Sequence, residues 1–122
     1  MKEKTRQQVL QIDREYFVKI AKGEHKIEHR LIYSSNETRY LDEDENGEIV
    51  PREYDTLKLI NGRRKNAPTL VVEVEKAEIY CVQDEDGNDV TYVDKSGETC
   101  YLYEIWYYLG KVLSIENAEG IL

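Results

Sequence analysis

The sequence predicts an α+β chain that is mostly β: a small β-barrel with one N-terminal helix. The chain has 122 residues, a length typical of one domain, so we expect 1–122 to form a single domain. Apolar residues show helical spacing once, early in the chain, and β-rich segments alternate with turn residues after residue 26. One helix followed by about five to seven short strands is typical of a small barrel.

The predicted helix follows a polar lead-in over residues 1–11. Asp13 is a suitable N-cap, and we expect the helix to run to about Lys22, where Gly23 ends it. The side chains expected on its buried side are those of Tyr16, Phe17 and Ile20.

Alternation of side chains predicts a strand over residues 26–33, KIEHRLIY. Residues 34–53 are polar and contain Asn46-Gly47, a hairpin turn signal. Residues 63–68 read as a basic loop. The other predicted strands cover 54–60, 69–75 with a continuation over 76–82 around a barrel corner, 90–93 between two turns, and 100–116 as one or two strands that break near Gly110.

Charge is distributed unevenly along the chain. The net charge is −8, yet residues 1–30 hold eight Lys or Arg against five Asp or Glu, so the remainder carries −11. An acidic chain resists nonspecific binding to nucleic acid, which needs many phosphate contacts. Any such contact should therefore be local, in the N-terminal third and at Arg63-Arg64-Lys65. The alternative is that the acidic remainder only aids solubility.

Composition also predicts the compartment. No apolar run approaches the roughly 20 residues that a membrane span needs, and the first residues lack the apolar core of a signal peptide. Cys81 and Cys100 form no C-x-x-C pair, which favours a reduced state. We expect a cytoplasmic protein with no membrane partner.

A signature follows the predicted helix. Gly23, Glu28 and Arg30 match the pattern G-x-K-x-x-E-x-R, with His25 at the Lys position and Lys26 beside it. Further segments that match in order are Y-D-x-L-x-x-x-N-G over 54–62, the V-V-E-V strand, and Y-Y-L-G-K-V-L over 107–113. In these segments the chain resembles the ASCH domain family, in particular a bacterial and phage branch of it. The resemblance implies a PUA-like β-barrel with a cleft that binds RNA or a modified nucleoside.

The signature has a physical basis of its own. Glu28 and Arg30 lie two apart on a strand and share a face, where either can hydrogen-bond a base edge. The alternative is that the two form only an ion pair that locks the fold. The tyrosines near Trp106 either pack the core or offer a stacking platform for a base. The predicted RNA- or nucleoside-binding residues are Gly23, His25, Lys26, Glu28, Arg30, Asn61, Arg63 and Arg64.

A nucleoside or RNA hydrolase is the alternative function. Some members of the family that this chain resembles hydrolyse the amide of N4-acetylcytidine. Those proteins use a Lys at the third signature position and a Thr at the sixth. This chain has His25 and Glu28 there, and a carboxylate cannot replace a hydroxyl nucleophile without a different intermediate. No catalytic residue is assigned, and binding without catalysis is the first expectation.

The acidic segment 42–53 satisfies the EF-hand loop pattern, from Asp42 through Gly47 to Glu53. An EF-hand needs a helix on each side, and Ser34-Ser35-Asn36 is a poor helix. We therefore expect an acidic hairpin, with a calcium-responsive or protein-binding module as the alternative. No metal site and no cofactor are expected.

Overall fold

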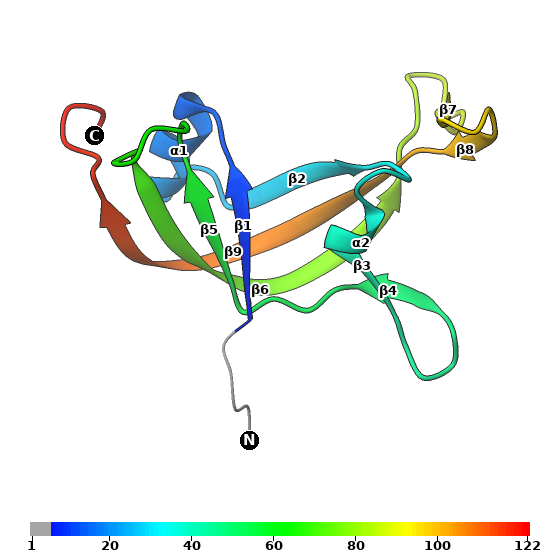
Figure 1. Ribbon diagram of the computed structural model, residues 1–122, viewed down its shortest axis with the longest axis horizontal. Helices are drawn as coiled ribbons and strands as arrows, with labels where there is room; N and C mark the ends of the chain where they lie inside the picture. The colour runs from blue at the N-terminus through cyan, green and yellow to red at the C-terminus, as the bar shows by residue number, and fades with distance from the viewer. Residues whose placement is uncertain (1–5) are drawn as a thin grey trace. The chain divides into compact units, whose positions relative to one another are not determined.

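The computed structural model describes residues 6–122, and its fold is α+β and mostly strand, as the sequence predicts (Figure 1). Within these residues there are two helices and nine strands. The helices are α1 (Arg14–Ala21) and α2 (Glu37–Tyr40), and the strands are β1 (Gln7–Gln11), β2 (Ile27–Ile32), β3 (Leu41–Glu43), β4 (Ile49–Pro51), β5 (Thr56–Ile60), β6 (Thr69–Cys81), β7 (Thr91–Val93), β8 (Thr99–Tyr101) and β9 (Tyr103–Glu116). Neither helix has the length and apolar character that a membrane span requires.

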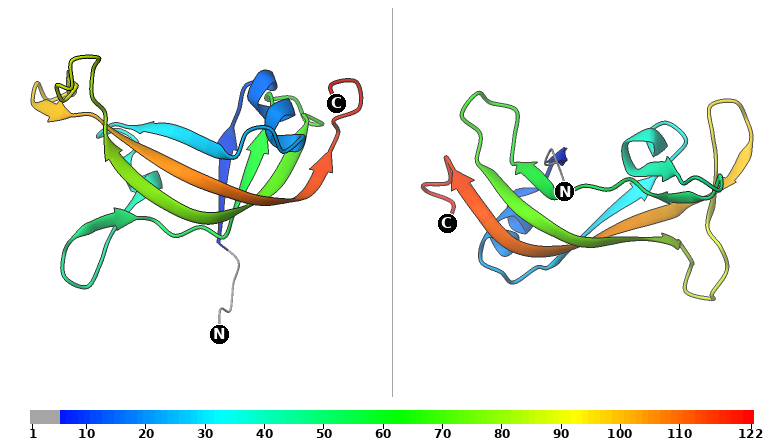
Figure 2. Two further views of the ribbon diagram at one scale, coloured as in Figure 1. Left: turned by 180° about the vertical axis from the view of Figure 1, so that it is seen from behind. Right: turned by 90° about the horizontal axis from the view of Figure 1, so that it is seen from below.

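Five strands form the main sheet, in the order β1-β5-β6-β9-β2. β1 pairs with β5 in parallel, and β5 pairs with β6 in antiparallel orientation. Figure 2 shows the two long strands, β6 and β9, running side by side. The order is open, because no pairing between the described strands joins β1 to β2, so no closed barrel is found. The β3–β4 and β7–β8 pairs form separate two-stranded sheets.

Contacts divide the chain into two compact units. The first contains the described part of Met1–Glu28 together with Glu53–Lys76 and Tyr108–Leu122. The second contains His29–Arg52 and Ala77–Tyr107. Each unit has buried apolar side chains of its own, such as Phe17 and Leu57 in the first and Ile32 and Ile105 in the second.

In the first unit, α1 buries Phe17 and Ile20 as predicted, and burial of one such side chain contributes roughly 1.5–3 kcal/mol. Gly23 ends the helix with φ +76°, a conformation that glycine adopts without strain. The prediction for Tyr16 is wrong, because its side chain is 41% exposed. Tyr16 precedes Phe17 by one residue, about 100° around the helix, and therefore leaves the buried side.

The predicted lead-in contains a strand. In β1 the side chains of Gln8 and Leu10 are buried, while Val9 between them is exposed. Pairing with β5 fixes this strand, and the side-chain Nε2 of Gln7 donates a hydrogen bond to Thr56 Oγ1 at 3.1 Å. Residues 1–5 of the lead-in lie outside the described residues.

The predicted break near Gly110 is wrong. β9 runs through Gly110 without interruption, and the chain instead breaks between β8 and β9 at Leu102. The Leu102 N–H donates to the carbonyl of Val90, and its carbonyl accepts from Val82 N–H. These two hydrogen bonds, together with the burial of the Leu102 side chain, hold the backbone at the break between β8 and β9 in the second unit.

Candidate functional site

The turn from Gly23 to Lys26 is held by backbone hydrogen bonds. The Lys19 carbonyl accepts from both Glu24 N–H, at 2.8 Å, and His25 N–H, at 3.2 Å. The Lys26 carbonyl accepts from Leu109 N–H of β9 at 2.8 Å. The signature turn is therefore fixed between the end of α1 and the middle of β9.

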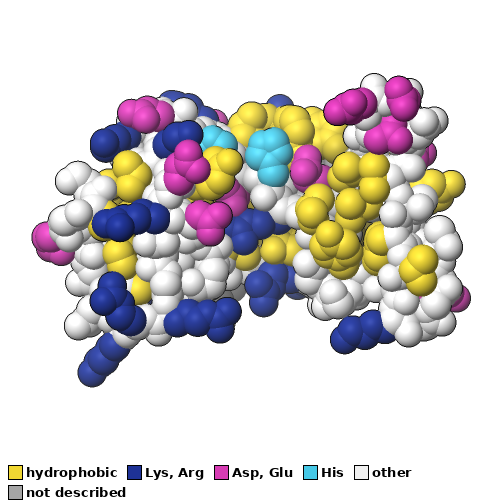
Figure 3. Space-filling model, turned by 90° about the horizontal axis from the view of Figure 1, so that it is seen from above, with side chains coloured by type: hydrophobic (Ala, Val, Ile, Leu, Met, Phe, Trp, Pro, Cys, Tyr) yellow, Lys and Arg dark blue, Asp and Glu magenta, His cyan; other side chains and the backbone are white. Residues whose placement is uncertain are grey.

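A pocket of about 290 Å³ opens at this turn, within the first unit. It is lined by the end of α1, by the turn, by Val72 of β6 and by residues 109–112 of β9. The polar side chains of its lining are basic: Lys22, His25, Lys26 and Lys111. We call these four residues and their cavity the basic pocket. Figure 3 shows basic, acidic and hydrophobic side chains around the histidines on one face of the molecule.

Gly110 allows the strands beneath the pocket to approach closely. A Cβ at this position would lie 3.1 Å from Glu75 Cγ and 3.3 Å from Glu73 Cβ. The Lys111 N–H donates to Glu73 Oε1 at 3.0 Å, so a carboxylate accepts from the backbone beside a pocket lysine. The hydrogen bond thus holds the Glu73 side chain against the backbone of β9.

An aromatic ring lies beside the basic pocket. The rings of Tyr16 and His25 are 5.1 Å apart between centroids and tilted by 47°. Lys19 Nζ lies 5.7 Å from the centre of the Tyr16 ring. Tyr16 is exposed and His25 half-buried, so both rings can contact a ligand at the surface.

Of the predicted binding residues, Gly23, His25 and Lys26 line the basic pocket. The others do not. Glu28 is buried in the first unit at 7% exposure, and Arg30 is half-buried in the second.

The predicted binding residues in the loop after β5 lie outside the basic pocket. Asn61 Nδ2 donates to the Ile12 carbonyl at 2.9 Å, which ties the loop to the segment after β1. Arg63 and Arg64 are exposed in the loop after β5. Lys22 and Lys111 line the pocket although the sequence did not single them out. The only signal for Lys111 was its place in the segment Y-Y-L-G-K-V-L.

In the second unit, Trp106 lies between two rings, with centroid distances of 4.5 Å to His29 and 4.6 Å to Tyr80. Trp106 Nε1 donates to Glu104, whose carboxylate also lies 3.5 Å from His29 Nδ1. Tyr107 instead is fully buried. The segment around Trp106 therefore contributes side chains both to the core and to the surface.

The acidic segment 42–53 contains the predicted hairpin, β3–β4, with Gly47 at φ +79° in its turn. Asp44 Oδ1 accepts from Asn46 N–H and Glu48 N–H, each at 2.9 Å. Within residues 6–122, no group of three or more His, Cys, Asp or Glu side chains is placed to hold a metal ion.

Comparison of the chain with protein-family models, with curated proteins and with solved structures found no match.

Proposed function

We propose that the chain binds single-stranded RNA or a nucleotide through the basic pocket. The observation that carries the proposal is the convergence of Lys22, His25, Lys26 and Lys111 on one cavity of the first unit. A PUA-like barrel and a cytoplasmic location belong to the same proposal, because they follow from the resemblance and the composition.

The chemistry of the pocket suits a phosphate. Lysine ammonium groups are flexible point charges that bind phosphate oxygens, and His25 adds a ring nitrogen. Tyr16 beside His25 offers a face on which a base can stack. A volume of about 290 Å³ is near the lower limit for ligand pockets, which favours one phosphate and its sugar over a larger ligand.

The acidic remainder of the chain disfavours binding of RNA outside the basic pocket. With a net charge of −8, the protein as a whole repels a polyanion. Glu28 does not line the pocket, so we propose binding rather than hydrolysis.

The test is the salt dependence of binding to a short fluorescein-labelled single-stranded RNA, followed by fluorescence anisotropy. Lys26→Gln and Lys111→Gln should each weaken binding, because each removes one lysine that neutralises a phosphate. The slope of log K against log salt concentration should become shallower by about 0.7 for each phosphate that is no longer neutralised.

Lys95→Gln is the matched control, since Lys95 is an exposed lysine in the turn between β7 and β8. It should change neither affinity nor slope. Equal effects of Lys95→Gln and Lys26→Gln, or no binding by the wild-type protein at low salt, would contradict the proposal.

A further inference from the structure

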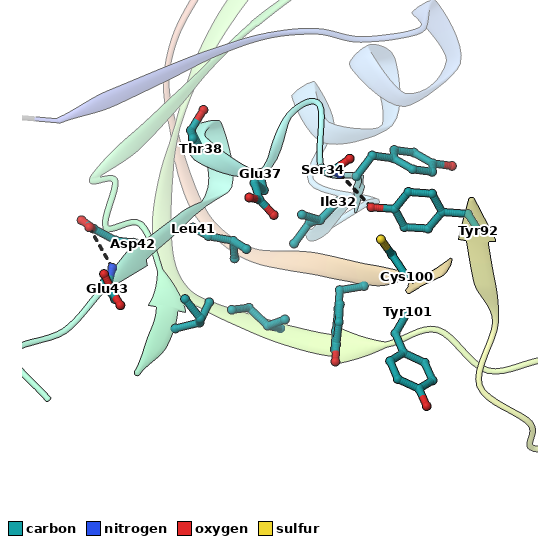
Figure 4. A pocket seen from close by; sticks show the side chains of 14 residues that line it. Ile32, Ser34, Glu37, Thr38, Leu41, Asp42, Glu43, Tyr92, Cys100 and Tyr101 are labelled. Atoms are coloured by element: carbon teal, nitrogen blue, oxygen red, sulfur yellow. Dashed lines mark hydrogen bonds between the residues drawn. The ribbon is translucent and has the colours of Figure 1, made fainter. Parts of the chain in front are cut away.

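The second unit has a cavity of its own, with a volume of about 740 Å³ (Figure 4). Its walls come from the end of β2, from α2 with the β3–β4 hairpin, from the β7–β8 hairpin, and from β6 and β9. We call it the tyrosine cavity. Its volume lies within the range of about 300–1,000 Å³ that is usual for small-molecule sites.

Tyrosine side chains make up much of the wall. Tyr33, Tyr92, Tyr101 and Tyr103 all line the cavity. Tyr33 and Tyr92 meet edge to face, with centroids 5.1 Å apart, and the Tyr92 hydroxyl accepts from Ser34 N–H at 2.8 Å. This part of the wall is therefore held in place before any ligand arrives.

Apolar surface is left open to solvent at the same place. Ile49 is 61% exposed, Tyr101 58% and Tyr103 42%, and all three line the cavity. Exposed apolar groups that gather around a concave site, rather than being scattered singly, indicate a binding site. Burial of a ligand's apolar body against them would be favourable.

The charges of the lining are all negative. Glu37, Asp42 and Glu43 line the cavity, whereas no lysine or arginine does. In Figure 4, Glu37 points between Ile32 and Leu41, while Asp42 and Glu43 lie at the rim. The Leu41 carbonyl accepts a hydrogen bond from the Arg52 guanidinium at 3.5 Å, but Arg52 does not line the cavity.

We propose that the tyrosine cavity binds a small organic cation: an ammonium or guanidinium group carried on an aromatic or branched aliphatic body. The carboxylate of Glu37 accepts hydrogen bonds from the cationic group, and tyrosine ring faces attract the same charge. The apolar body packs against Ile32, Ile79 and the exposed rings. An anion of the same shape is repelled by three carboxylates, so RNA is excluded here.

The test uses three indole probes that differ in charge: tryptamine, the neutral tryptophol, and indole-3-acetate. Each is titrated into the full-length protein by calorimetry. Tryptamine should bind about tenfold more tightly than tryptophol, the effect of one charge-assisted contact, and indole-3-acetate most weakly. Equal affinities for the three probes, or no binding of tryptamine at millimolar concentration, would overturn the proposal.

Variants separate charge from packing. Glu37→Gln should lower tryptamine affinity about tenfold and leave tryptophol unchanged, because only the cation uses the carboxylate. Tyr101→Leu should weaken both probes. Glu45→Gln, in the same hairpin but outside the lining, should change neither. Thermal melts of each variant establish that it is folded.

A basic peptide is the competing ligand. An oligolysine peptide that binds while tryptamine does not would show that the surface takes a protein segment, and would overturn the small-molecule proposal. Unchanged tryptamine affinity in Glu37→Gln would show that the carboxylate does not recognise the cation.

Discussion

Gly110 lies where the first unit leaves little room for a side chain. A Cβ would come within 3.1 Å of Glu75 Cγ and 3.3 Å of Glu73 Cβ. Both distances are shorter than ordinary van der Waals contacts. The Glu73 carboxylate also accepts a hydrogen bond from the Lys111 N–H. The residue is therefore constrained by packing and not by backbone conformation.

Gly110→Ala should lower the free energy of unfolding by about 1 kcal/mol, at the lower end of overpacking penalties. The variant should also weaken RNA binding, since a shift of Glu73 displaces Lys111 at the rim of the basic pocket. Chemical denaturation and anisotropy measure the two effects. Unchanged stability would mean that the glutamates move aside freely.

The two cysteine thiols are held in their protonated form. Burial raises the pKa of the Cys100 thiol, and its hydrogen bond to Asp94 and the charge of that carboxylate raise the pKa further. Burial, with the charge of Asp89, raises the pKa of Cys81. The thiolate is the reactive form, so both residues should be poor nucleophiles at neutral pH.

In a Cys81→Ser background, Cys100 should react with iodoacetamide more slowly than a free cysteine near neutral pH. Asp94→Asn should speed the reaction, because it removes the carboxylate that raises the pKa of the thiol. Asp84→Asn, in the neighbouring turn, should not. A rate–pH profile that is identical in Asp94→Asn and its parent would show that Asp94 does not control this thiol.

At the scale of the element, the second unit uses one turn design three times. Asp44-Glu45-Asn46-Gly47-Glu48, Asp84-Glu85-Asp86-Gly87-Asn88 and Asp94-Lys95-Ser96-Gly97-Glu98 share the pattern Asp-x-x-Gly-x. In each, Asp Oδ1 accepts from two backbone N–H groups, and the glycine has φ between +79° and +87°. The aspartate side chain thus closes the turn that the glycine makes possible.

The third turn predicts a pH effect. The Ser96 hydroxyl and the Glu98 and Ser96 amides donate to Asp94, and they hold the pKa of its carboxyl below the ordinary value of 3.8. A lowered pKa in the folded state stabilises the fold above pH 3.8, and this contribution is lost as the pH falls through the lowered pKa.

Asp94→Asn should therefore melt at a lower temperature than wild type at neutral pH, and the difference should shrink in strongly acidic solution. Lys95→Gln, in the same turn, should melt like wild type at both pH values. Thermal melts followed by circular dichroism provide the measurement. A difference that is independent of pH would mean that the charge of Asp94 does not stabilise the turn.

At the scale of the whole molecule, each unit has one of the two proposed sites, and the sites have opposite charge. The basic pocket belongs to the first unit and the tyrosine cavity to the second. The net charges of the units differ in the same sense: residues 1–28, 53–76 and 108–122 together carry +2, whereas residues 29–52 and 77–107 together carry −10. Opposite charges suit different ligands, so an anion and a cation need not compete for one place.

Local rules made much of the fold predictable. Glycine after a helical pattern placed the end of α1, alternation placed β2, and Asn46-Gly47 placed the β3–β4 turn. These features depend on a few neighbouring residues, whose backbone preferences act whatever the rest of the chain does. For the same reason one short segment contains Gly23, His25 and Lys26, which line the basic pocket.

Tertiary structure alone decided what depends on distant partners. The sequence of β1 is that of a polar segment, and pairing with β5 makes it a strand. Lys111 and Lys26 line the same pocket because the Leu109 N–H donates a hydrogen bond to the Lys26 carbonyl and so holds β9 against the turn. The tyrosine cavity draws its walls from segments spread over residues 32–103. The sequence by itself determined the local conformations and the balance of charge, while the pockets arose from pairing between segments whose distance along the chain hides their proximity.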